Sequence, residues 1–156
     1  MNKKNMKKSK GFTLIEILVV IGIIAILAAI VIIAINPARQ FAQSRNSQRS
    51  ANVNAILNAI GQNLADNKGI FTCAAGVIPT TATEMSNSGY NIRPCIVPTY
   101  IPEIPFDPST GSFTSPTVYE TEYTVLRDAT TARITVCAPG GAEAAISGSS
   151  AICVTR

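Results

Sequence analysis

The side chains that most often carry enzyme chemistry are few in this chain, and their spacing predicts no active site. The sequence contains no histidine, which excludes a Ser-His or Cys-His nucleophile pair and a histidine metal cluster. Glu120 and Glu122 stand two residues apart in a run that alternates with tyrosine and threonine, so we interpret them as the solvent face of a strand. We therefore predict that the protein is not an enzyme and holds neither a cofactor nor a metal.

The second reactive group is a set of four cysteines, Cys73, Cys95, Cys137 and Cys153. They show no Cys-x-x-Cys spacing, and the chain has no histidine, so the pattern favours disulfides over a zinc site. Four cysteines permit three pairings. Proximity in sequence favours Cys73 with Cys95 and Cys137 with Cys153, and each bond would contribute about 3 kcal/mol by restricting the unfolded chain. The other two pairings remain open on the sequence.

A single acid, Glu16, lies inside a long apolar run. Apart from Glu16 and Thr13, all residues from Phe12 to Ile35 are apolar or small. A helix over this run would be roughly 36 Å long at about 1.5 Å per residue, enough to cross a hydrocarbon layer of about 30 Å. A carboxylate within a membrane helix costs on the order of 2.5 to 3.5 kcal/mol, so we expect Glu16 to have a partner.

Residues 1–10 precede this run and carry five lysines and no acid. Under the positive-inside rule, they stay cytoplasmic and the residues after Ile35 lie outside. Two ordinary interpretations are a plain single-pass anchor and a secretory signal peptide cut near Ala28. The apolar run is longer than the about 7 to 15 residues of a signal peptide. A plain anchor does not explain why Gly11 separates the lysines from the run.

The residues Gly11 to Glu16 (GFTLIE), placed between a lysine-rich leader and an apolar helix, resemble the N-terminal signature of type IV prepilins and of type II secretion pseudopilins. The resemblance implies that a prepilin peptidase and methyltransferase cuts between Gly11 and Phe12 and N-methylates Phe12. It also implies that Glu16 pairs with the amine of a neighbouring subunit. That pairing would offset the cost of a buried charge and favour one axial register.

The same resemblance implies the partners and the location. The partners would be identical or related pilin subunits, the lipid bilayer, an assembly platform protein and a cytoplasmic ATPase. The chain would cross the inner membrane once, with the N-terminus cytoplasmic, and then enter a periplasmic or extracellular filament. The alternative is a single-pass, membrane-anchored extracytoplasmic binding protein that does not polymerise.

The formal net charge of +4 belongs mostly to the leader. Of 13 basic residues five are leader lysines, so the chain from Phe12 keeps 8 basic against 9 acidic residues, a net of −1. We therefore predict no nucleic-acid partner. Arg39, Arg45 and Arg49 are interpreted as a solvated or interfacial helix face beside the membrane.

Residues 36–69 predict a second, amphipathic helix. Asn36 and Pro37 should interrupt the first helix. An apolar stripe with helical spacing follows, and Asn67 to Gly69 provide a stop. The stripe consists of Val53, Ile56, Leu57, Ile60 and Leu64.

Residues 70–156, which we call the head, are expected to form a small core held by the cysteines. Residues 72–116 are rich in proline and polar residues and predict an irregular loop. Three strands should follow near 119–125, 132–138 and 151–155. The segment YIPEIPFD, ending at Asp107, is similar to the stretch before the sheet of major pseudopilins, but the residues after it differ, so we expect a turn residue rather than a calcium ligand. The predicted fold is α+β and pilin-like: leader 1–11, membrane helix 12–35, amphipathic helix 36–69, and an antiparallel sheet in residues 70–156.

Overall fold

The computed structural model describes residues 11–156, so the predicted cytoplasmic leader lies, except for Gly11, outside the described residues. The chain divides into two compact units, Met1–Pro37 and Ala38–Arg156. Each unit is described by itself below.

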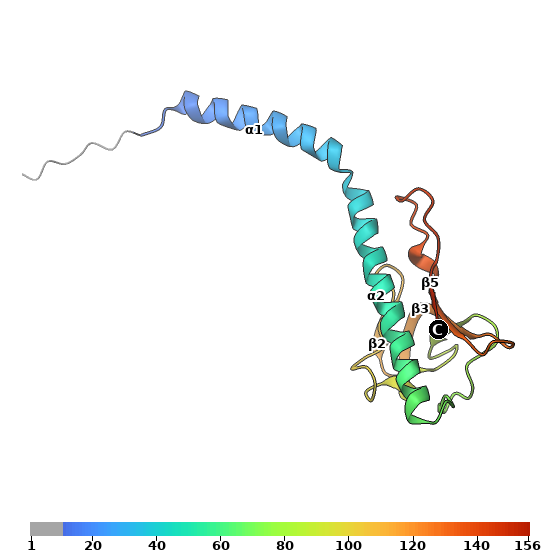
Figure 1. Cartoon of the computed structure of the whole chain (residues 1–156). Coiled ribbons are helices and arrows are strands. Elements are labelled where there is room, and N and C mark those ends of the chain that lie inside the picture. The colour runs from blue at the N-terminus through green and yellow to red at the C-terminus, as the bar shows by residue number, and fades with distance from the viewer. Residues whose placement is uncertain (1–10) are drawn as a thin grey trace, which may run out of the picture. The chain divides into compact units, whose positions relative to one another are not determined.

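The first unit contains one helix, α1, Leu14–Ile35 (Figure 1). By length and composition its stretch Leu14–Ile33, with a mean hydropathy of 3.2, is able to cross a membrane, and none of that stretch is buried. The helix ends where Asn36 adopts a left-handed conformation with φ 47°, and the next helix begins at Pro37. Proline lacks an amide donor and disfavours helix at the residue before it, which explains this predicted interruption.

Helix α2, Pro37–Asp66, lies in the second unit from its second residue, Ala38, onward. Its predicted stripe is buried at Val53, Ile56, Leu57 and Ile60 and half-buried at Leu64, because residues at that spacing share one helical face. The helix stops as predicted. Lys68 and Gly69 have positive φ values, and the Gly69 amide donates to the Leu64 carbonyl at 2.7 Å.

Five antiparallel strands form one sheet in the order β1-β3-β4-β5, with β2 also paired to β3. They are β1 Thr83–Ser86, β2 Ser112–Ser115, β3 Val118–Arg127, β4 Ile134–Ala138 and β5 Ile152–Thr155.

The predicted irregular loop over 72–116 is therefore wrong in part, because it contains β1, β2 and the short helix α3, Arg93–Ile96. Both extra strands have four residues and a register shift against β3, so neither gives a readable alternation in the sequence. A 3-10 turn, η1, Pro139–Gly141, follows β4.

The core lies between α2 and the inner face of the sheet. Tyr119, Thr121, Tyr123 and Val125 point inward from β3, which explains the alternating pattern of that strand. The connecting segments add buried apolar side chains that fill the remaining space: Ile78, Met85, Ile92, Ile96 and Ile104. The predicted α+β class is thus confirmed, with an apolar helix, a second helix and a small antiparallel sheet in a pilin-like arrangement.

Two disulfides hold the head, Cys73–Cys95 and Cys137–Cys153, the pairs that sequence proximity favours. The second joins directly opposed residues of β4 and β5.

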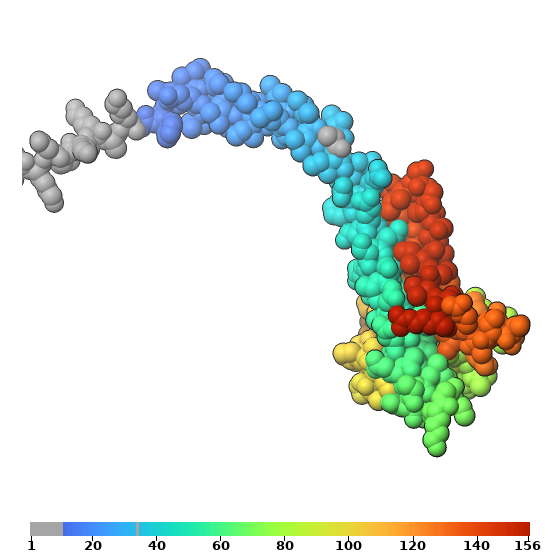
Figure 2. Space-filling model, in the orientation of Figure 1, coloured from blue at the N-terminus to red at the C-terminus, as the bar shows by residue number. Residues whose placement is uncertain are grey.

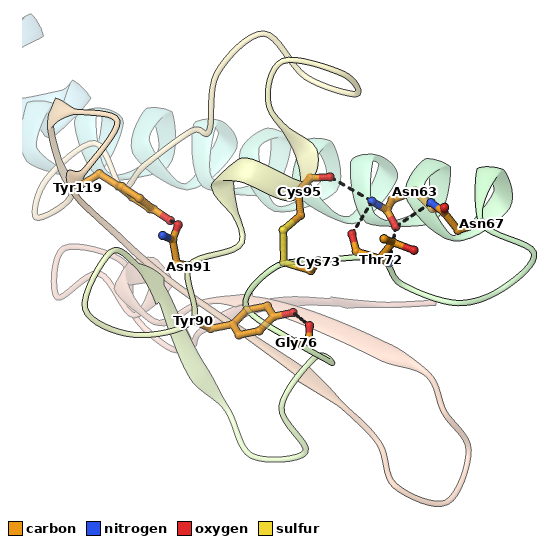
Figure 3. The surroundings of a disulfide bond; sticks show 9 residues. All are labelled: Asn63, Asn67, Thr72, Cys73, Gly76, Tyr90, Asn91, Cys95 and Tyr119. Atoms are coloured by element: carbon orange, nitrogen blue, oxygen red, sulfur yellow. Dashed lines mark hydrogen bonds between the residues drawn. A yellow bond between two sulfur atoms is a disulfide. The ribbon is translucent and has the colours of Figure 1, made fainter.

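The first disulfide ties the segment after α2 to α3 (Figure 3). Beside it, the buried Asn63 side chain donates to the carbonyls of Thr72 and Cys95 and accepts from the Thr72 amide at 2.9 Å. One polar side chain of α2 therefore fixes both segments that carry this disulfide.

Candidate processing and assembly site

The start of α1 is closed by a reciprocal pair of hydrogen bonds between Thr13 and Glu16. Thr13 is extended and forms the N-cap, and its hydroxyl accepts from the Glu16 amide at 3.3 Å. In return, Glu16 Oε2 accepts from the Thr13 amide at 2.7 Å and from the Thr13 hydroxyl at 2.8 Å. This is a capping box, which satisfies two amides that a helix start leaves without partners.

The capping box gives the acid of the apolar run a partner within its own chain. A carboxylate in the first helical turn also interacts favourably with the positive end of the helix dipole. Sequence reasoning missed this contact, although the Thr-x-x-Glu spacing from Thr13 to Glu16 is its recognised signal.

Gly11 and Phe12 precede the cap outside regular structure, and both are exposed, Phe12 to 84%. A Cβ atom built on Gly11 would meet no atom within 4 Å, so the folded chain itself does not require glycine there. Phe12 and Glu16 line one open apolar hollow together with Ile15 and Val19, so they lie on the same side of the helix start.

A second polar cluster, the Arg49 cluster, lies where α2 meets the head and consists of Arg45, Arg49, Asp107 and Glu143. The Arg49 guanidinium binds Asp107 through both carboxylate oxygens, at 2.6 and 3.0 Å, and Glu143 Oε1 at 2.5 Å. The side chains of Arg49 and Asp107 are only 2% and 0% exposed. The prediction that Arg49 lies on a solvated face is therefore wrong.

Arg45 also departs from that prediction, since it holds both carboxylate oxygens of Glu143 at 2.6 Å. The next residue, Asn46, donates through its side chain to the Gly141 carbonyl at 3.0 Å. These contacts fasten the segment after β4 to the first half of α2, and Figures 1 and 2 show this orange-red stretch alongside that helix. Arg39 is exposed and is not a member of the Arg49 cluster.

Electrostatics within the Arg49 cluster keep all four groups charged. Burial by itself would raise the pKa of Asp107, but hydrogen bonds from Arg49 and Ser109 hold that pKa well below its usual value. Hydrogen bonds from Arg45 and Arg49 lower the pKa of Glu143 to about 2. The hydrogen bond to Asp107 in turn raises the pKa of Arg49.

Asp107 has a second role as the turn residue that the sequence predicts. Its Oδ1 atom accepts from the amides of Ser109 at 2.8 Å and Thr110 at 3.3 Å. Gly140 lets the segment after β4 approach this ion pair, because a Cβ there would lie 2.8 Å from Asp107 Oδ2 and 3.1 Å from Arg49 Nη2. The cluster thus joins α2, the turn at 107–110 and the turn at 139–143.

Glu120 and Glu122 lie on the exposed face of β3, as their alternation predicts. Glu84 of the neighbouring strand β1 joins them, and one oxygen from each of the three carboxylates lies within 4.8 Å of the other two. Sequence reasoning missed Glu84 because its position depends on the pairing of β1 with β3.

Comparison with protein families matches residues 6–34 to the prokaryotic N-terminal methylation motif. No curated protein and no solved structure matches the chain. The matched residues contain Gly11, Phe12, the capping box and nearly all of α1. By this match the protein carries the prepilin-type N-terminal signature.

Proposed function

We propose that the protein is a pilin or pseudopilin, a structural subunit that prepilin peptidase cuts between Gly11 and Phe12 and that assembles into a filament through α1. The observation that carries this proposal is the methylation motif in register with an exposed segment just ahead of a capped apolar helix. The motif is common to pili and secretion pseudopili, so the proposal covers both.

The local structure suits proteolysis. A peptidase binds its substrate as an extended chain, and Gly11 and Phe12 lie outside the helix and away from the folded second unit in sequence. Since nothing within 4 Å would obstruct a side chain at Gly11, we attribute the glycine to the requirements of the peptidase. Methylation of the new amine at Phe12 would follow.

Cleavage would place a cation one residue ahead of the helix cap. Glu16 would then pair with the Phe12 amine of a neighbouring subunit, as family resemblance implies. In a low-dielectric setting, an unpaired charge is penalised, so this pair would favour one axial register between subunits. The capping box would hold the carboxylate at the helix start before docking, because Thr13 is its partner within the chain.

The apolar surface of α1 supports the same function. Its large side chains are exposed along the whole helix, and none of the span Leu14–Ile33 is buried within the chain. Exposed apolar area of this extent needs a cover, which would be the bilayer before assembly and the α1 helices of other subunits afterwards. The subunit would therefore reside in the inner membrane with residues 38–156 outside, and then in the filament.

The test is a pair of substitutions at Glu16 in the host strain. Glu16→Gln removes the charge but keeps a side chain that can complete the capping box, whereas Glu16→Ala removes both. We expect both variants to be cut after Gly11 and to remain in the membrane, with filaments lost in each. Normal assembly of Glu16→Gln would contradict a role for the charge. A wild-type chain that is neither cut nor polymerised would instead leave the anchored binding protein as the function.

A further inference from the structure

A small apolar pocket opens near the C-terminal end of α2. It has a volume of about 250 Å³, and its walls include Leu64, Phe71, Ile78 and Ile134. Two further lining residues, Ile70 and Val77, are 70% and 77% exposed. Among the described residues of the second unit, these two are the most accessible of five exposed large apolar side chains, the other three being Phe41, Phe106 and Val118.

Cations gather around this pocket. Arg127 lines it, Lys68 precedes the lining residue Gly69, and Arg133 lies between two lining residues. All three are exposed, and within residues 11–156 none of them forms an ion pair. The carboxylate of the nearby Asp128 is engaged by the amides of Thr130 and Thr131.

This concentration of positive charge stands out because the region is acidic on balance. From Ala51 onward the chain has five basic residues and a larger number of acids. Of the other two basic residues, neither of which lines the pocket, Arg93 pairs with Glu103 and Arg156 donates to Asn58. Among the described residues from Ala51 onward, the basic side chains with neither an ion pair nor a side-chain hydrogen bond are therefore the three at the pocket.

The volume indicates the kind of occupant. Small-molecule sites usually measure roughly 300 to 1,000 Å³, so this pocket is better matched to one apolar side chain of a protein partner. The cations around it would attract acidic residues next to that side chain. The complementary surface is therefore an apolar residue beside a group of carboxylates.

The outer face of β3 offers this combination. Val118, Glu120 and Glu122 alternate along the strand and are all exposed, Val118 to 54%. With Glu84 they place three carboxylates within 4.8 Å of one another. Like charges at this distance repel, so contact with cations of another molecule would be favourable. We call Val118, Glu84, Glu120 and Glu122 the acidic face.

We propose that the acidic face of one copy docks on the pocket of the next, with Val118 in the pocket and its acids against Lys68, Arg127 and Arg133. Along β3 the distance from Glu120 to Arg127 is roughly 23 Å at about 3.3 Å per residue, so the two surfaces are distinct. A contact between two different surfaces repeats from copy to copy and builds an open filament. This inference rests on the proposed filament function and identifies a contact between heads.

The wild-type filament allows a direct test, because Lys68 is the one lysine left after cleavage behind Gly11. A zero-length carbodiimide reagent joins lysine to a carboxylate in contact with it. In filaments grown from a mixture of isotopically light and heavy protein, we expect links from Lys68 to Glu84, Glu120 or Glu122 that join a light and a heavy chain. Intact filaments whose Lys68 links only to other acids, or to none, would overturn the proposal.

Charge reversal gives an independent test in the full-length protein. We expect Arg127→Glu and Glu120→Lys each to lower the yield of sheared filaments on the order of tenfold, and the double variant to recover most of the yield. Arg156→Glu makes the same charge change at a side chain that binds Asn58 and does not line the pocket, and this variant should assemble normally. Wild-type yield in both single variants, or no recovery in the double variant, would contradict the contact.

The two proposals fail in different ways. If the wild-type chain is not cut or forms no filament, the proposed function fails. If the wild-type chain forms filaments and only the cross-links and charge reversals give the contrary result, the function stands and this contact is wrong.

Discussion

Replacing Asp107 by asparagine should destabilise the second unit strongly, because it leaves Arg49 buried with part of its charge uncompensated. Arg49 and Asp107 are 2% and 0% exposed and share two hydrogen bonds, at 2.6 and 3.0 Å. Removing one partner of a buried ion pair costs about 3 to 5 kcal/mol. Glu143 remains on Arg49 at 2.5 Å, so we expect the lower end, about 3 kcal/mol in the free energy of unfolding.

The assay is urea unfolding of the full-length protein in detergent, followed by near-ultraviolet circular dichroism. All four tyrosines, and no tryptophan, lie in residues 70–156, so this signal reports the head. The matched control is Glu103→Gln, which breaks the pair of Arg93 with a 42% exposed carboxylate. Exposed pairs contribute about 0 to 1 kcal/mol, so this control should lose less than about 1 kcal/mol.

A double variant separates the pair from its packing. Arg49→Met combined with Asp107→Leu removes both buried charges. The double variant should therefore lose less stability than the sum of the losses in Arg49→Met alone and Asp107→Leu alone. The reasoning would be refuted if Asp107→Asn cost no more than Glu103→Gln, or if the two single losses simply added. Either result would mean that the ion pair does not hold the head on α2.

The remaining predictions concern pH, the disulfides and Gly11. The lowered pKa values of Asp107 and Glu143 contribute stability at neutral pH that should decline from about pH 4.5, near the unfolded pKa values, towards about pH 2; urea midpoints against pH check this, and stability rising on acidification would contradict it. Replacing both members of Cys137–Cys153 by serine should cost about 3 kcal/mol in the same urea assay, the contribution expected from a disulfide with a sequence separation of 16 residues; an unchanged midpoint would refute that contribution. Gly11→Val should block cleavage and leave the near-ultraviolet spectrum unchanged, since a side chain there meets nothing within 4 Å; a mature-sized band on a gel would argue against a glycine requirement.

The parts of the fold that sequence predicts well are those with a long, regular period. The unbroken apolar run gives α1, and the stripe from Val53 to Leu64 gives the buried face of α2. Alternation from Tyr119 to Val125 predicts most of β3 and the exposure of Glu120 and Glu122. In each case, the pattern depends on neighbours within one element, so no knowledge of the tertiary structure is needed.

What sequence reasoning missed depends on contacts between distant segments. Arg49 lies four residues before Val53 and so on the buried face of α2, but its helix does not identify the carboxylates that pair with it, because Asp107 and Glu143 are 58 and 94 residues away. Strands β1 and β2 are too short to show alternation and exist through their pairing with β3. The capping box is different, since Thr-x-x-Glu is local and was available as a signal.

The most direct test of the central claim is the intact mass and N-terminal sequence of the protein isolated from its own host membranes. The proposed function predicts a chain that begins at Phe12 with a methylated amine and retains α1. A chain that still begins at Met1 would contradict processing by a prepilin peptidase and point to an anchored monomer. A chain cut near Ala28 would contradict it too, because α1 would then be a signal peptide.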